Sequence, residues 1–153
     1  MLKTHGVLHF SLPVTDLDRS RRFYEGLLGM KVIEQSPRMV FLRTGDDYII
    51  LAKGNEPLKY DSAKTTPVHH AFKVTPEEFE SSLDDLRKNG VEVFNIENRN
   101  EGVFWGPQAY FLDPDGNKLE IYAGPGAKKP DRGRPSALPR RVRLLILTES
   151  VRA

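Results

Sequence analysis

Two histidines and one glutamate occupy positions from which they could bind a single metal ion. His9 and His69 each lie six residues before a threonine that opens a helical pattern. Further along, "KLEIYAG" aligns with "YIILAKG" and places Glu120 opposite Ile50. Two imidazoles and one carboxylate suit a catalytic divalent ion that keeps open positions. This mixture favours Mn²⁺, Fe²⁺, Co²⁺, Ni²⁺ or Zn²⁺ over Ca²⁺ or Mg²⁺.

Each of these side chains has an ordinary explanation when it is taken alone. A histidine on a strand is more often hydrogen-bonded or solvated than a metal ligand, and a strand glutamate usually faces solvent. Their equivalent positions in a repeat are what favour a shared site. Alternation along the strand selects His69 over His70, because His70 shares its side of the strand with the apolar Phe72 and Val74.

The elements that carry these residues follow the order strand, helix and three strands, and this order occurs twice. Helices are predicted over 15–29 and 75–90, each with a threonine near its start and a glycine at its end. The predicted strands are 7–14, 30–34, 39–43 and 48–53 in the first unit, and 68–74, 91–94, 109–112 and 118–122 in the second. Two such units that pack with approximate two-fold symmetry would bring equivalent strand positions together.

The repeat predicts an α+β fold in which one module spans 6–55 and a second spans 67–124. The modules differ by ten residues, which we place in "NIENRNEGVFWGP", Asn95–Pro107, after the second strand of the second module. We expect this insertion, with Phe104 and Trp105, to act as a lid that excludes water.

Composition narrows the class of protein. The chain has 153 residues, of which 39% are hydrophobic and 29% are charged, and it contains no cysteine. A catalytic thiol, thiolate ligands and disulfides are therefore excluded, and a cytoplasmic protein with no membrane partner is expected. The Pro/Arg-rich tail 125–153 carries eight basic and two acidic residues. Because this tail lacks aromatic residues for stacking, we favour a solvated extension and expect no nucleic-acid partner.

Three segments resemble the vicinal oxygen chelate superfamily, which includes glyoxalase I, extradiol dioxygenases, bleomycin-resistance proteins and fosfomycin-resistance enzymes. They are "LHFSLPVTDLDRSRRFYEGLLGMKV", "VHHAFKVTPEEFESSLDDLRKNGVEV" and "AYFLDPDGNKLEIYAG". The resemblance implies paired βαβββ modules that form a cupped mixed sheet around a metal, often completed in a homodimer. It also implies that the metal ligands are His9, His69 and Glu120. Glyoxalase I uses a fourth glutamate where this chain has Ile50, so the layout is most similar to the fosfomycin-resistance thiol transferases.

The resemblance also implies roles for residues around the metal. Ser11 and Tyr110 take the positions of a threonine and a tyrosine that act on the substrate. Arg99 is similar to an arginine on the anion-binding loop, and Phe104 and Trp105 lie in that loop as further substrate-binding residues. The family's loop lysine has no counterpart here, because Ile96 falls near its place.

These observations lead us to expect a metal-dependent enzyme acting on a small oxygenated molecule. The metal would act as a Lewis acid, and a small thiol co-substrate or water would add to the substrate, because the chain has no thiol of its own. Two alternatives stay open. The same three ligands occur in Fe(II) ring-cleaving dioxygenases of the extradiol type. A non-catalytic antibiotic-binding protein of the bleomycin-resistance kind is the other.

Overall fold

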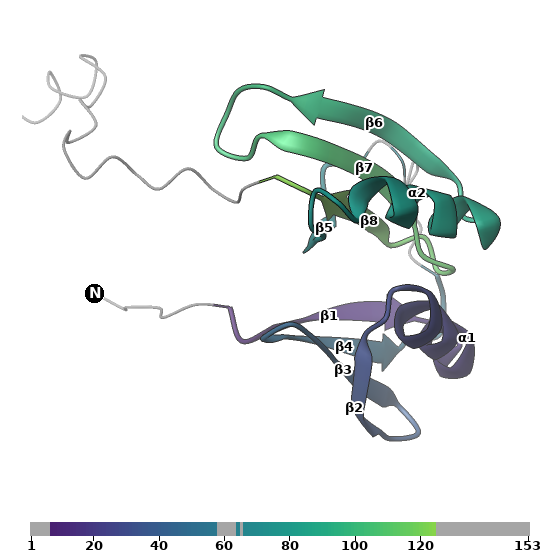
Figure 1. Cartoon of the computed structure of the whole chain (residues 1–153). Helices are drawn as coiled ribbons and strands as arrows, with labels where there is room; N and C mark the ends of the chain where they lie inside the picture. Colours follow the sequence, from purple (N-terminus) through teal and green to yellow (C-terminus); the bar gives the residue numbers. More distant parts are fainter. Residues whose placement is uncertain (1–6, 58–63, 65, 125–153) are drawn as a thin grey trace, which may run out of the picture.

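The computed structural model describes residues 7–57, 64 and 66–124. The basic tail 125–153 lies outside the described residues. The described chain forms two four-stranded mixed sheets, here called sheet A and sheet B, each accompanied by a helix. Figure 1 shows the two modules one above the other, with their helices on the same side. The predicted α+β class is confirmed.

Sheet A comes from the first module and has the strand order β1-β4-β3-β2. Its strands are β1 (His9–Val14), β2 (Lys31–Gln35), β3 (Met39–Thr44) and β4 (Asp47–Lys53). β1 and β4 are parallel, and the other pairs are antiparallel. The helix α1 (Leu17–Arg21) continues into a π-helical segment η1 (Arg22–Leu27).

Sheet B repeats this topology with the strand order β5-β8-β7-β6. Its elements are β5 (His70–Lys73), α2 (Phe79–Lys88), β6 (Val93–Arg99), β7 (Gly106–Leu112) and β8 (Lys118–Tyr122). In the parallel pair of sheet A, Ser11 lies opposite Ile50. In the parallel pair of sheet B, Ala71 lies opposite Glu120. The strand pairing therefore confirms that Ile50 and Glu120 occupy equivalent positions.

The helix starts follow the capping signals, with one difference. At α2 the capping box forms: the Thr75 amide donates to Glu78 Oε2 at 3.0 Å, and the Glu78 amide donates to Thr75 Oγ1 at 3.3 Å. At α1 the cap is Asp16, whose side chain accepts from the Arg19 amide. Thr15, the threonine at which this helix was predicted to start, bonds instead to Asp115 of the second module.

The two modules share one hydrophobic core. Leu12 and Val14 of sheet A and Phe111 and Leu119 of sheet B all belong to a single cluster of buried side chains. Phe23 of η1 reaches the ring of Phe111, with centroids 6.4 Å apart. The helix-covered faces of the two sheets are thus turned toward each other, and the opposite face of each sheet points outward.

The turn "DPDGN" between β7 and β8 joins the modules in addition to reversing the chain. Asp115 is buried and accepts hydrogen bonds from three residues of the first module. These partners are Thr15 (amide at 3.0 Å, hydroxyl at 2.6 Å), Arg19 (2.6 Å) and Ser20 (3.1 Å). The buried Tyr24 hydroxyl donates to Asp113 at 2.7 Å. Besides connecting β7 to β8, this turn therefore binds the second module to the first.

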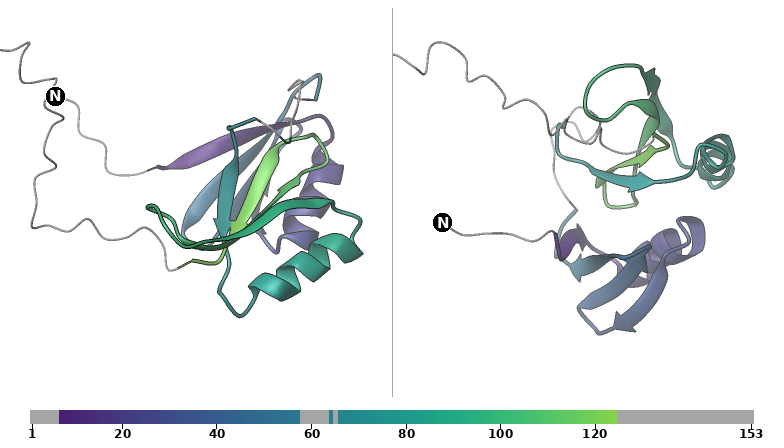
Figure 2. Two further views of the ribbon diagram at one scale, coloured as in Figure 1. Left: turned by 90° about the horizontal axis from the view of Figure 1, so that it is seen from above. Right: turned by 60° about the vertical axis from the view of Figure 1, so that its left-hand side comes forward.

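The insertion 95–107, which was expected to act as a lid, is mostly strand. Residues 95–99 extend β6 and residues 106–107 extend β7, so the added length forms a long, curved hairpin whose tip is 100–105. Figure 2 shows this hairpin bending over sheet B. The hairpin is fixed next to its tip, where Gly106 and Gly124 cross closely, and a β-carbon on Gly106 would lie 2.7 Å from the Gly124 α-carbon.

Candidate functional site

His69 and Glu120 form a pair on the outward face of sheet B. Nε2 of His69 lies 3.0 Å from Oε2 of Glu120. The Glu120 side chain is buried, and the His69 side chain is one-third exposed. Nδ1–H of His69 donates to the carbonyl oxygen of Pro67 at 2.8 Å. That hydrogen bond fixes the ring orientation and directs Nε2 toward the carboxylate.

The geometry of this pair fits two ligands of one cation. A metal-binding histidine usually donates its other ring N–H to a carbonyl or carboxylate, as His69 does to Pro67. Two donors bound at right angles to one ion at about 2.1 Å lie about 3.0 Å apart. Without a cation, the same separation suits an imidazolium–carboxylate ion pair. The nitrogen and oxygen donors match Mn²⁺, Fe²⁺, Co²⁺, Ni²⁺ or Zn²⁺.

Tyr110 lies beside this pair on β7. Its ring meets that of His69 edge-on, with centroids 5.4 Å apart. Burial raises the pKa of the Tyr110 hydroxyl, and the charge and hydrogen bond of Glu120 raise it further. The hydroxyl is therefore protonated at neutral pH and acts as a hydrogen-bond donor. The Gln108 side-chain amide also reaches it, at 3.5 Å.

A β-bulge at Asn95 sets which side chains of β6 face the site. Asn95 has φ of 49°, and the pairing register with β7 shifts by one residue between Phe94 and Glu97. Glu97 lies opposite Gln108, and Arg99 lies opposite Gly106. A shift of one residue turns every following side chain to the other face of a sheet. The bulge therefore places Glu97 and Arg99 on the same face as Tyr110.

These side chains enclose a pocket of about 340 Å³. Its lining residues are Asn95, Ile96, Glu97, Arg99, Tyr110 and Lys118. Arg99 Nε lies 3.1 Å from Glu97 Oε1, and the Gln108 amide donates to the same oxygen. Lys118 Nζ lies 4.6 Å from the centre of the Tyr110 ring. The predicted residues Arg99 and Tyr110 thus meet in one pocket next to the His69–Glu120 pair.

His9 and Ser11 lie elsewhere in the single chain. Both are exposed on the outward face of sheet A, because Phe10, Leu12 and Val14 occupy the opposite face of β1. Within the described ranges 7–57, 64 and 66–124, no three histidine, aspartate or glutamate side chains are close enough to hold one ion. The three ligand residues named from the sequence are therefore not assembled by one chain: two meet, and His9 is apart.

Phe104 and Trp105 are exposed at the tip of the hairpin, at 54% and 39%. The Phe104 ring packs edge-on against Tyr122 of β8, with centroids 6.1 Å apart, and the Tyr122 hydroxyl donates to the Trp105 carbonyl at 2.8 Å. Tyr122 lies two residues from Glu120 on the same face of β8. The tip is therefore held over the outward face of sheet B, beside the pocket and outside its lining.

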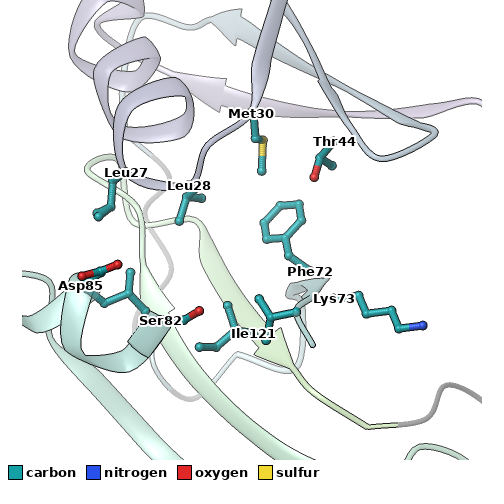
Figure 3. A pocket seen from close by; sticks show the side chains of 11 residues that line it. Leu27, Leu28, Met30, Thr44, Phe72, Lys73, Ser82, Asp85 and Ile121 are labelled. Carbon is teal, nitrogen blue, oxygen red and sulfur yellow. The ribbon is translucent and has the colours of Figure 1, made fainter. Parts of the chain in front are cut away.

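A second cavity lies at the junction of the modules and has a different character. It measures about 140 Å³ and lies between η1, α2 and β5. Figure 3 shows Leu28, Met30 and Phe72 converging on it. Ser82 and Asp85 of α2 supply polar groups at its edge. Its lining contains no histidine, and we regard it as a packing space between the modules.

Sequence reasoning missed two charged residues that line the site pocket, Lys118 and Glu97, and also Gln108, which contacts Glu97 beside the pocket. Lys118 had a detectable signal, because it lies two residues before Glu120 and so shares its face of the strand. Glu97 had none, because strict alternation from Phe94 would have turned it away from the site. No helix in the described part of the chain is long and apolar enough to cross a membrane.

Comparison with known proteins agrees with this fold. The model of the Glyoxalase/Bleomycin resistance protein/Dioxygenase superfamily matches residues 6–121. "Glutathione transferase FosA" of Serratia marcescens is 33% identical over 116 residues, covering 76% of this chain and 79% of that protein. "Metallothiol transferase FosB" of Staphylococcus saprophyticus is 28% identical over 116 residues, covering 76% and 75%.

Solved structures of related proteins have the same fold. A variant of the fosfomycin resistance protein FosX from Listeria monocytogenes, solved with Mn(II) and 1S,2S-dihydroxypropylphosphonic acid, superposes with a TM-score of 0.68. It is 25% identical, and the match covers 80% of this chain and 92% of FosX. The repeated βαβββ topology, the family match over residues 6–121 and these relatives lead to one conclusion: the chain belongs to the Glyoxalase/Bleomycin resistance protein/Dioxygenase superfamily.

Proposed function

We propose that this chain is a divalent-metal-dependent enzyme that opens the epoxide ring of fosfomycin, or of a closely related phosphonate, by adding a thiol or water. The observation that carries the proposal is the His69–Glu120 pair, whose donor atoms converge at 3.0 Å beside Tyr110. The relatives support the choice of substrate, because FosA is a glutathione transferase, FosB is a metallothiol transferase and FosX is a fosfomycin resistance protein.

His69 and Glu120 would hold the ion, together with His9 from a second copy of the chain. Each single chain turns the outward face of sheet A away from the outward face of sheet B, so His9 reaches the pair only across a dimer. Tyr48 and Met39 on sheet A are exposed apolar side chains on the same face as His9, which favours a contact there. The proposed assembly is a homodimer with two sites.

The bound ion would supply Lewis-acid stabilisation of the negative charge that develops on the epoxide oxygen. The residues of the chain would bind and orient the substrate and exclude water. The neutral Tyr110 hydroxyl donates a hydrogen bond to the substrate, and Arg99 contributes positive charge at the pocket. Ser11, on the same face as His9, offers a second hydroxyl. Phe104 and Trp105 at the hairpin tip restrict access of bulk water.

The bond changes balance without any redox partner. The sulfur or oxygen of the nucleophile forms a bond to one epoxide carbon while the carbon–oxygen bond of the ring breaks. The proton lost by the thiol or water leaves to solvent, and the ring oxygen takes up a proton to become a hydroxyl. With water, the product is a vicinal diol, the class of compound with which FosX was solved. With a thiol, the product is a thioether alcohol.

The ring-cleaving alternative is less well supported. Oxygenase chemistry at such a site would use a further acid or base beside the metal, and His70 is the nearest imidazole in sequence. Its ring stacks on Phe10 with centroids 4.4 Å apart on the helix-covered side of the strand. His70 is thus directed away from the His69–Glu120 pair.

The test combines metal analysis with product detection. Protein purified without chelators is assayed for metal, and fosfomycin turnover is followed by ³¹P NMR with glutathione, with L-cysteine and with water alone. We expect Mn²⁺-dependent conversion that is lost in Glu120→Gln, whereas Glu80→Ala on the exposed face of α2 retains it. Tight metal binding that persists in both Glu120→Gln and Glu120→Ala would rule out this site.

A further inference from the structure

We propose that Lys118 binds the anionic phosphonate group of the substrate, in the pocket that it shares with Tyr110 and Arg99. The proposal deepens the function given above and rests on it for the identity of the substrate. It assigns an anion-binding role to a strand residue, in a chain that has Ile96 near the place of the family's loop lysine.

The first support is the position of Lys118 beside the ligand pair. Lys118 begins β8 and lies two residues before Glu120, so both side chains project from the same face. His70 lies opposite Leu119 in the β5–β8 register, which places the preceding His69 next to Lys118. A small molecule with an oxygen near the His69–Glu120 pair therefore has its other end within reach of this ammonium group.

The second support is the way the ammonium group is held. Nζ donates to the carbonyl oxygen of Thr66 at 3.1 Å and lies 4.6 Å from the centre of the Tyr110 ring. These two contacts fix the long side chain at the pocket wall. A lysine ammonium has three N–H donors, and the Thr66 carbonyl takes one of them. Donors remain for the oxygens of a bound anion.

The third support is the charge balance of the pocket. Arg99 is the other cation in the lining, and its guanidinium is already paired with Glu97 at 3.1 Å. Lys118 forms no ion pair with any carboxylate in the part of the chain that the structure describes. Of the two lining cations, Lys118 is therefore the one without an ion-pair partner among the described residues, and an anionic ligand gains most from it.

Lys64, which lies just before the second module, provides a matched comparison. Its Nζ lies 5.5 Å from the centre of the Phe94 ring, so it also packs on an aromatic side chain. Both carboxylate oxygens of Glu92 lie close to it, at 2.6 Å and 2.7 Å. Lys64 thus has the aromatic contact of Lys118 but carries a neutralised charge, and it lines a different pocket.

The experiment is a calorimetric titration of Mn²⁺-loaded protein with methylphosphonate. This ligand carries the anionic group but no epoxide. We expect methylphosphonate binding to weaken at least about tenfold in Lys118→Met and Lys118→Gln, because each variant loses one charge-assisted hydrogen bond. Lys118→Arg should keep most of the affinity, and Lys64→Met should match the wild type. Mn²⁺ affinity should be the same in all five proteins, which separates anion binding from damage to the metal site.

Unchanged methylphosphonate affinity in Lys118→Met and Lys118→Gln would overturn the proposal, and so would an equal loss in Lys64→Met. The carboxylates of a thiol co-substrate offer similar chemistry, so S-methylglutathione is titrated in parallel. Dependence on Lys118 for that ligand but not for methylphosphonate would also overturn it. Lys118-dependent methylphosphonate binding without any fosfomycin turnover would support the anion site and refute the proposed reaction. Fosfomycin turnover with an unaltered KM in Lys118→Met would instead support the proposed reaction and refute the anion site.

Discussion

Ile50 and Glu120 occupy the same position in the two sheets: Ile50 lies opposite Ser11 in the parallel pair of sheet A, and Glu120 lies opposite Ala71 in that of sheet B. The two modules share their topology yet differ at this point in their capacity to bind a cation. The first module offers His9 alone, whereas the second offers a histidine and a carboxylate that already converge.

Replacing Ile50 by glutamate should add a fourth ligand to the proposed site. Ile50 is only partly buried on the outward face of sheet A, so the substitution should be tolerated. We expect Ile50→Glu to bind Mn²⁺ about tenfold more tightly and to turn over fosfomycin more slowly, because an open coordination position is filled. Competition with a fluorescent chelator measures the affinity. Ile50→Leu is the control, and equal Mn²⁺ affinity in both variants would contradict the model.

A mixture of two inactive variants should recover activity if the site is shared between copies. His9→Ala and Glu120→Gln each remove one ligand from both sites of a homodimer. In a mixed dimer one site loses both ligands and the other keeps all three. Random exchange after refolding together should restore about a quarter of the wild-type rate. No recovery, with mixed dimers confirmed by native mass spectrometry, would place all three ligands within one chain or refute the site.

The buried carboxylate of Asp115 should be a main determinant of stability. Its hydrogen bonds to Thr15, Arg19 and Ser20 cross from one module to the other. Asp115→Asn removes the partner of the Arg19 charge, and we expect the free energy of unfolding in urea to fall by about 3 kcal/mol. The exposed turn residue Asp46, changed to asparagine, should have an effect within about 0.5 kcal/mol.

The same carboxylate should contribute to acid unfolding. Burial alone would raise the pKa of Asp115, but the hydrogen bonds from Thr15, Arg19 and Ser20 outweigh it and lower the pKa below the normal value. A lowered pKa in the folded state means that this stabilisation is present above about pH 4 and is lost as the pH falls through the folded-state pKa. Asp115→Asn should therefore lose stability less steeply than the wild type below pH 4 in urea titrations.

Two glycines should respond in opposite directions to alanine. At Gly124 a β-carbon would collide with the Tyr122 hydroxyl and the Trp105 carbonyl, which hold the hairpin tip. Gly124→Ala should lower the free energy of unfolding by about 1–3 kcal/mol. At Gly26 in η1 a β-carbon meets nothing within 4 Å, so Gly26→Ala should be neutral or stabilising, by about 0.5–1 kcal/mol. Calorimetric melting would detect both changes, and a stable Gly124→Ala would contradict the crossing.

Much of the fold was predictable because its signals are local and occur twice. Periodicity and caps located the strands and helices, and the repeat register placed His69 and Glu120 on neighbouring strands. The role of "DPDGN" was not predictable, because a turn signal does not reveal that Asp115 also binds Thr15 of the other module. The separation of His9 from the pair depends on which faces the modules turn toward each other, and strand periodicity is the same in either arrangement.

The bulge at Asn95 has a consequence for how such a site can change over generations. Loss of the Asn95 codon would remove the extra residue but keep Glu97 opposite Gln108, so Glu97 and Arg99 would stay at the pocket. A substitution of Asn95 that closes the bulge at unchanged chain length would restore strict alternation, so Ile96 and Asn98 would take the places of Glu97 and Arg99. A gene encoding this hairpin can therefore exchange charged for uncharged groups at its binding surface without altering the codons of those groups.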